Sequence, residues 1–217
     1  MDMDPTPPPM IRSSAGVTLA GGGPMTGETL AAALARAPRL VAADGGYDRA
    51  LALGHRPEAV VGDLDSISPA GRARAIHDPD QETTDFQKAM ARIEARFVIG
   101  VGFLGGRMDH ALAALSALSG PTILLGEDDL AFRAPERLAM DLPEGLRFSL
   151  FPLGPAGGES EGLEWPIDGM RFAPDGRIGT SNRVTGPVRL RLHGPMIVLL
   201  PPEGLDAALA ALSSSAR

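Results

Sequence analysis

Short apolar runs recur through the first 125 residues of the chain, and segments with helical spacing separate them. Gly, Asp or Pro adjoins four of the five runs, as is usual for buried strands. The runs lie at 17–20, 40–43, 60–61, 97–103 and 122–125. Because strands that alternate with helices build α/β sheets, this pattern predicts a mostly parallel, doubly wound domain.

Capping signals mark the starts of the intervening helices. Thr26 is a candidate N-cap for the first of them, and Ser68, followed by a proline, predicts a short helix through Ala75. Thr84 and Gln87 have the spacing of a capping box. The residues after this box share one helical face: Phe86, Ala89, Met90, Ile93 and Phe97.

The pattern changes after about residue 135. Short apolar stretches, separated by Gly, Pro and Asp turn signals, lie at 147–151, 163–167, 188–192 and 196–200. This spacing is typical of an all-β domain, which we expect to be a sandwich smaller than the first domain. A short helix is predicted over 205–212 at the end of the chain.

Three segments are therefore expected. Residues 1–12 are acidic and rich in proline, which predicts a disordered tail. Residues 13–134 would form the α/β domain and residues 135–217 the β-sandwich domain.

Composition excludes several classes of function. The 217-residue chain has a formal net charge of -7 and no long Lys/Arg run, which argues against nucleic acid or an anionic membrane as partner. Without Cys there are no disulfides, thiolate nucleophiles or Cys-type zinc sites. The four His residues show no paired ligand spacing, so zinc is not expected. No signal-like start and no apolar run of membrane-spanning length is present, and we expect a cytoplasmic protein.

Two carboxylates follow the 60–61 strand with one residue between them. In an extended chain Asp63 and Asp65 point the same way, about 6.6 Å apart, so both can bind one hard cation. Mg²⁺ is usually held by one or two carboxylates together with water and substrate phosphates. A second interpretation stays open at this point, a solvated Asp turn in which Ser66 or Ser68 caps the next helix.

The glycine-rich stretch after the first strand imitates a phosphate-binding P-loop. Gly22 and Gly27 have the correct spacing, but Glu28 stands where the motif requires Lys, so the motif is rejected. Two interpretations of the glycines remain. Their backbone N–H groups face a phosphate at a helix N-terminus, or they form a tight turn.

Further carboxylates follow other predicted strands. Asp44, Asp63, Asp65 and Asp109 all fall at strand carboxyl ends, which meet at one edge of a parallel sheet. Carboxylates that converge without cations repel one another, so this cluster implies a bound metal or a cationic ligand. Taken alone, Asp109 and His110 are also ordinary residues for the start of a helix.

Five motifs in this order resemble those of thiamin pyrophosphokinases. They are Ala43-Asp44-Gly45-Gly46, Gly62-Asp63-Leu64-Asp65-Ser66, Thr84-Asp85-Phe86-Gln87-Lys88, Gly105-Gly106-Arg107-Met108-Asp109-His110 and Thr180-Ser181-Asn182. The resemblance implies an α/β nucleotide-binding and catalytic domain followed by a β-sandwich domain for thiamin binding and dimerisation. It further implies a homodimer and the transfer of pyrophosphate from Mg-ATP to thiamin, giving thiamin diphosphate and AMP.

The resemblance also implies roles for individual residues. Asp63, Asp65 and Asp85 would hold Mg²⁺. Arg107 or Lys88 would stabilise charge on the transferred group or on AMP, and Asp109 is the candidate general base. The nucleotide and transfer site would comprise Asp44, Gly45, Gly46, Gln81, Thr84, Lys88, Arg107 and Asp109, and thiamin would meet Ser181, Asn182 and Trp165.

Alternatives remain at this point. The carboxylate pattern also suits a related pyrophosphokinase that acts on a hydroxymethyl dihydropterin, although Trp165 and the Thr180-Ser181-Asn182 motif favour thiamin. A non-catalytic nucleotide or thiamin sensor would need fewer carboxylates. For Trp165 a core or interface anchor without ligand contact is the competing interpretation.

Overall fold

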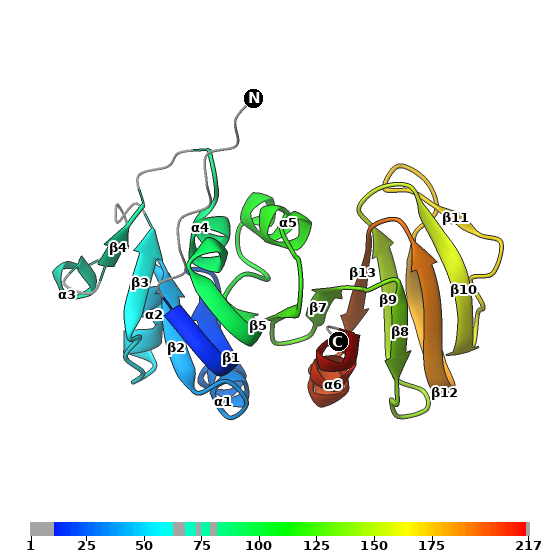
Figure 1. Cartoon of the computed structure of the whole chain (residues 1–217), viewed down its shortest axis with the longest axis horizontal. Coiled ribbons are helices and arrows are strands. Elements are labelled where there is room, and N and C mark those ends of the chain that lie inside the picture. The colour runs from blue at the N-terminus through cyan, green and yellow to red at the C-terminus, as the bar shows by residue number, and fades with distance from the viewer. Residues whose placement is uncertain (1–10, 63–67, 73–74, 79–81, 216–217) are drawn as a thin grey trace. The chain divides into compact units, whose positions relative to one another are not determined.

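The computed structural model describes residues 11–62, 68–72, 75–78 and 82–215 (Figure 1). The chain divides into two compact units, Met1–Ala117 and Leu118–Arg217. This division falls earlier in the chain than the boundary between residues 134 and 135 that the sequence suggested.

The first unit contains a parallel sheet. In Figure 1 its strands lie in the order β5-β1-β2-β3-β4, and each neighbouring pair is parallel. The strands are β1 (Ile11–Ala20), β2 (Arg39–Ala43), β3 (Ala59–Gly62), β4 (Ala75–His77) and β5 (Ile93–Val101). Val17, Val41 and Val60 are completely buried on the central strands, where apolar runs of this kind belong.

Helices follow these strands at positions that the capping signals predicted. Thr26 caps the first helix by accepting a hydrogen bond from the backbone N–H of Thr29 at 3.2 Å. The capping box of Thr84 and Gln87 is present at the start of the fourth. The helices are α1 (Gly27–Leu34), α2 (Gly46–Ala52), α3 (Pro69–Arg72), α4 (Asp85–Ala91) and α5 (Met108–Ser116).

Three boundaries in this unit differ from the prediction. Ile11 and Arg12, assigned to the tail, belong to β1, where Ile11 pairs with Ile93 and is buried. The predicted helix through Ala75 is wrong, because α3 ends at Arg72 and Ala75 already lies in β4. The helix after Thr84 ends at Ala91. The alternating residues that follow belong to β5, since pairing with β1 decides their conformation.

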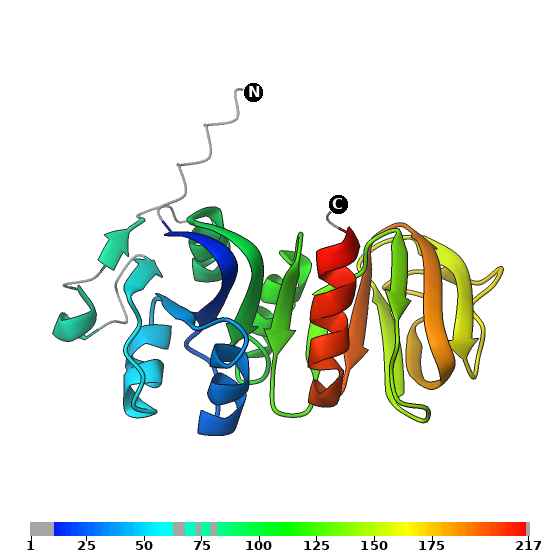
Figure 2. The ribbon, with the colours of Figure 1, turned by 60° about the horizontal axis from the view of Figure 1, so that its bottom comes forward.

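The second unit is built mainly from antiparallel strands, and every strand pair within it is antiparallel. Two sheets share β12, one ordered β6-β7-β13-β9-β12 and the other β8-β12-β10-β11. The strands are β6 (Thr122–Leu125), β7 (Leu130–Arg133), β8 (Arg137–Met140), β9 (Arg147–Pro152), β10 (Ala156–Leu163), β11 (Arg171–Phe172), β12 (Gly179–His193) and β13 (Met196–Leu200). After a short 3-10 turn, η1 (Pro202–Gly204), the red helix α6 (Leu205–Ser215) in Figure 2 packs against β8.

Two sequence predictions need correction here. The strand expected over 163–167 is wrong, because Leu163 ends β10 and the chain then turns. The strand at 122–125 was assigned to the parallel domain, but β6 pairs antiparallel with β7. The fold as a whole therefore has mixed strand pairing, and the doubly wound arrangement of the first domain stays a prediction.

Within the described ranges, no helix is both long enough and apolar enough to cross a membrane.

Candidate functional site

Three glycine-containing loops meet at the carboxyl ends of β1, β2 and β5. A Cβ atom on Gly46 would lie 2.0 Å from the carbonyl oxygen of Ala20, and one on Gly23 would lie 2.6 Å from that of Gly102. A backbone hydrogen bond joins two of the loops, from Gly23 N to Gly102 O at 2.9 Å. Any side chain at these contacts would push the loops apart. The sequence therefore uses glycine where three strand ends approach one another closely.

Asp44 directly follows β2 and lies in the loop between β2 and α2. It is buried, and its φ of 39° lies in the left-handed region that residues other than glycine rarely adopt. Its backbone N–H donates to Val61 O at 2.9 Å, and a Cβ on Gly62 would lie 3.0 Å from its Cβ. The structure thus holds a carboxylate in a constrained conformation at the sheet edge, which is typical of a functional position.

The central acidic motif, Asp63, Asp65 and Ser66, lies outside the described residues, as does Gln81. The residues that flank the motif are described. Gly62 packs beside Asp44, and Ser68 donates its backbone N–H and its hydroxyl to the carboxylate of Asp48 at 2.9 and 2.6 Å. Both flanking residues are thereby joined to β2 and α2. Asp48 could not be identified from the sequence, because nothing local links it to a residue 20 positions away.

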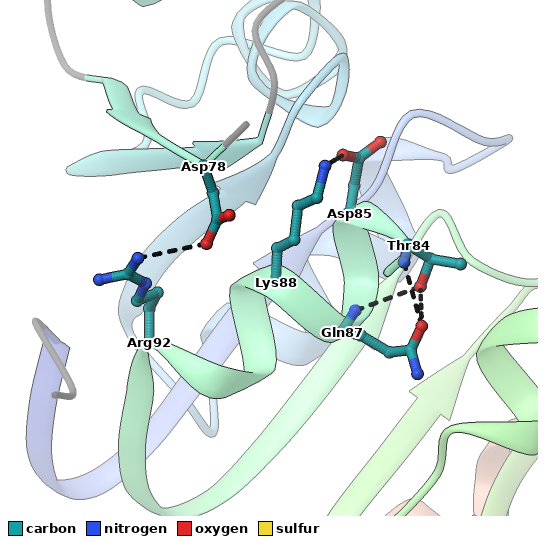
Figure 3. Close-up of polar contacts among 6 residues, drawn as sticks. All are labelled: Asp78, Thr84, Asp85, Gln87, Lys88 and Arg92. Atoms are coloured by element: carbon teal, nitrogen blue, oxygen red, sulfur yellow. Dashed lines mark hydrogen bonds and ion pairs between the residues drawn. The ribbon is translucent and has the colours of Figure 1, made fainter. Parts of the chain in front are cut away.

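Helix α4 carries a buried cation near its start (Figure 3). Lys88 is only 4% exposed, and its Nζ lies 3.8 Å from Oδ1 of Asp85, one turn earlier on the helix. A buried ammonium is stable only beside a carboxylate or another polar partner. The capping box of Thr84 and Gln87 fixes the helix start, and hence Asp85. The structure therefore brings together three predicted site residues, Thr84, Asp85 and Lys88.

A second ion pair lies at the other end of α4. Arg92 Nη2 and Asp78 Oδ2 are 3.2 Å apart, and both side chains are largely buried (Figure 3). The pair links the residue after β4 to the C-cap of α4. This ion pair could not be found from the sequence, since β4 itself was not predicted.

The loop after β5 presents an exposed ion pair. Arg107 donates to both carboxylate oxygens of Asp109, at 3.2 and 2.6 Å, and the backbone N–H of His110 donates to the same carboxylate at 3.0 Å. Hydrogen bonding between the two side chains lowers the pKa of Asp109 and raises the pKa of Arg107. His110 lies exposed in the first turn of α5, as its helix-start interpretation predicted.

In the second unit the structure connects Trp165 directly with Asn182. Oδ1 of Asn182 accepts from the backbone N–H of Trp165 at 3.1 Å, and its Nδ2 donates to the carbonyl of Trp165 at 2.7 Å. The Trp165 side chain is 52% exposed, which disfavours the interpretation of a core anchor. Ser181, next to Asn182, is also exposed.

Metal ligands were predicted at Asp63, Asp65 and Asp85. Among the described residues, no group of three or more His, Asp or Glu could hold a metal ion. Two of the three predicted ligands lie outside that part of the chain. The metal assignment therefore remains a prediction from the sequence.

Two family models match the chain in succession. The model described as "Thiamin pyrophosphokinase, catalytic domain" matches residues 30–122, and "Thiamin pyrophosphokinase, vitamin B1 binding domain" matches residues 137–197. The predicted site residues of the first unit that the structure describes fall within the first match, and Trp165, Ser181 and Asn182 fall within the second.

Individual proteins are similar to the chain as well. Thiamine pyrophosphokinase 3 of Oryza sativa subsp. japonica is 30% identical over 158 residues, which is 60% of this chain and 59% of that protein. The match thus spans about three fifths of the length of that curated relative. The solved thiamin pyrophosphokinase from Candida albicans has a TM-score of 0.73 at 16% identity and covers 93% of this chain and 95% of its own. The one from Geobacillus thermodenitrificans has a TM-score of 0.68 at 17% identity, covering 86% and 96%.

Proposed function

The chain belongs to the thiamin pyrophosphokinase family, and on that basis we propose that it transfers pyrophosphate from ATP to thiamin. The products would be thiamin diphosphate and AMP. The observation that carries this proposal is the succession of a catalytic and a vitamin B1 binding domain model on one chain. A homodimer in the cytoplasm is part of the same proposal.

The first unit is suited to binding the triphosphate of ATP. Gly22 is exposed and Gly45 is half-buried where β1 and β2 end, while Gly46 packs against Ala20. Backbone N–H groups at such strand-to-helix turns bind phosphate. Arg107 adds a guanidinium that is 70% exposed. Because Asp109 holds this guanidinium by two hydrogen bonds, it is oriented before a ligand arrives.

Asp109 is better suited to orientation than to proton transfer. A lowered pKa means that its carboxylate accepts a proton less readily than an ordinary aspartate does. We therefore assign it to holding Arg107 rather than to general base catalysis. Positioning and charge stabilisation supply most of the catalysis in such transfers, so a dedicated base is not required.

The acidic residues suit a divalent cation. The ligands of the cation would be carboxylate oxygens, the type that Mg²⁺ prefers. Asp85 fits this use, because its carboxylate is 39% exposed at the start of α4. Asp63 and Asp65 would complete the set. A bound Mg²⁺ neutralises charge on the triphosphate and polarises the phosphoryl group.

The overall chemistry has one bond formed and one broken. The hydroxyl oxygen of thiamin would attack the β-phosphorus of ATP, the bond between this phosphorus and the oxygen bridging it to the α-phosphorus would break, and AMP would leave. Arg107 and Lys88 are the cations available to stabilise the negative charge that moves onto AMP.

An acceptor comparison tests the proposal. Purified protein with ATP and Mg²⁺ should form AMP when thiamin is added and form none with hydroxymethyl dihydropterin. AMP formation with the pterin alone would assign the other substrate. Saturable binding of thiamin without any AMP would instead identify a sensor.

A further inference from the structure

Strand β12 changes sheets within a few residues. Val184 pairs with Leu163 of β10, whereas Asn182 pairs with Phe148 of β9. The register against β9 shifts between Gly179 and Asn182, and within this bulge Ser181 has a φ of 59°. A left-handed residue other than glycine persists only where its surroundings hold it, and such bulges redirect side chains beside functional sites.

The side chain of Ser149 stabilises the bulge. Its hydroxyl accepts a hydrogen bond from the backbone N–H of Ser181 at 3.0 Å, in place of the carbonyl that a regular ladder would supply. Ser149 lies on β9 and is 5% exposed, so water cannot readily replace this contact.

The side chain of Asn182 makes hydrogen bonds to the backbone of Trp165 that a paired strand would otherwise make. The ladder between β10 and β12 continues as far as Glu164, whose N–H donates to Arg183 O at 2.9 Å. At Trp165 the side chain of Asn182 then meets both the backbone N–H and the carbonyl, and its Oδ1 also accepts from Arg183 N at 2.8 Å. Two N–H groups face Oδ1 and one carbonyl faces Nδ2, so the carboxamide has a single orientation. Asn182 itself is only 8% exposed, so these part-buried contacts are shielded from water on its side.

The residue fixed in this way exposes a large aromatic ring. Trp165 is the single tryptophan of the chain, and Pro166 after it further restricts its backbone. Burial of an indole would normally be favourable, yet half of this side chain remains accessible. A rigid backbone beneath an exposed aromatic ring suits the presentation of that ring to a flat, cationic ligand.

We propose that Asn182 and Ser149 are positioning residues, which hold the Trp165 indole and the Ser181 hydroxyl as one preformed face for the thiamin ring. Asn182 then acts through Trp165 and does not itself contact thiamin. This inference rests on the proposed function for the identity of the ligand.

The test compares Asn182→Ala and Ser149→Ala with a matched control, Thr185→Ala, an exposed position on the same strand. Asn182→Ala should raise the KM for thiamin about tenfold and leave the KM for ATP nearly unchanged. The reason is that this variant loses the three hydrogen bonds of the Asn182 side chain, which hold only the thiamin face. Ser149→Thr, which keeps the hydroxyl, should restore what Ser149→Ala loses. The control should match the wild type.

The fluorescence of Trp165 provides a readout that does not depend on activity. Without thiamin, acrylamide should quench Trp165 more efficiently in Asn182→Ala than in the wild type. Unchanged quenching with a raised KM for thiamin would overturn the inference and make Asn182 a direct contact. Equal rises in both KM values would also overturn it, because they indicate general damage. If Asn182→Ala does not fold, the same readouts on the Ser149 pair decide.

Failure of the proposed function would be visible separately. In that case the wild type would form no AMP with thiamin. Increased quenching in Asn182→Ala would then support the positioning of Trp165 for another ligand, while unchanged quenching would reject it.

Discussion

The proposed metal site depends on single carboxylates that follow β3 in the sequence. Asp63→Asn and Asp65→Asn should each lower turnover by at least about 100-fold, since each removes a charge on which a Mg²⁺ site depends. Thermal stability should hold or rise, because like-charge repulsion is relieved when no metal is bound. The control is Asp175→Asn, an exposed turn position in the second unit.

Steady-state turnover across a Mg²⁺ series measures this effect. Near-normal activity of either variant at low Mg²⁺ would contradict the metal site and favour the interpretation of the motif as a helix-capping turn.

The pair of Arg107 and Asp109 predicts a pH dependence. Because the folded pKa of Asp109 is lowered by Arg107, the stability that this pair contributes is complete above the ordinary carboxyl pKa, near 4, and is lost as pH falls through the lowered value. Carbon-13 NMR titration of the Asp109 carboxyl should give a higher pKa in Arg107→Met than in the wild type. The same midpoint in both proteins would show that the ion pair does not form in solution.

Close packing of elements at the strand ends gives a stability prediction. Gly46→Ala should lower the free energy of unfolding by at least about 2 kcal/mol, because its Cβ would lie 2.0 Å from the carbonyl of Ala20 and α2 would have to move. Gly27→Ala is the matched control at the first residue of α1, where nothing lies within 4 Å, and it should be neutral or stabilising by up to about 1 kcal/mol. Urea unfolding of both variants measures the difference, and equal midpoints would contradict it.

Elements with strong local signals were predictable from the sequence. Thr26 and the Thr84–Gln87 box mark the helix starts correctly, because a cap depends on residues three positions apart. Strand β10 was missed, since its glycines and glutamates have low strand propensity and it forms through pairing with β12. The end of α4 was misplaced for a similar reason, as pairing with a distant strand overrides helical spacing.

Site residues follow the same division between local and distant contacts. Asp44 could be selected because it directly follows a predicted strand, whereas Asp85 and Arg107 were assigned through the family resemblance. The contact between Asn182 and Trp165 joins residues 17 positions apart through a change of sheet, so no local pattern indicates it. The pair of Asp48 and Ser68 was missed for the same reason.

The assembled molecule is expected to be a homodimer. Native mass spectrometry should give twice the 22.5 kDa chain mass at micromolar concentration. In a twofold dimer the same surface patch of each subunit forms the interface, so a substitution at that patch acts twice. A monomeric mass that persists as concentration rises would contradict the expectation.

The bond at which ATP is cleaved tests the central claim most directly. With ATP, Mg²⁺ and thiamin, phosphorus-31 NMR and chromatography of one reaction should show AMP and thiamin diphosphate forming in equal amounts. The reason is that transfer of pyrophosphate breaks the link between the α- and β-phosphates. Accumulation of ADP in step with thiamin monophosphate would contradict the proposed reaction.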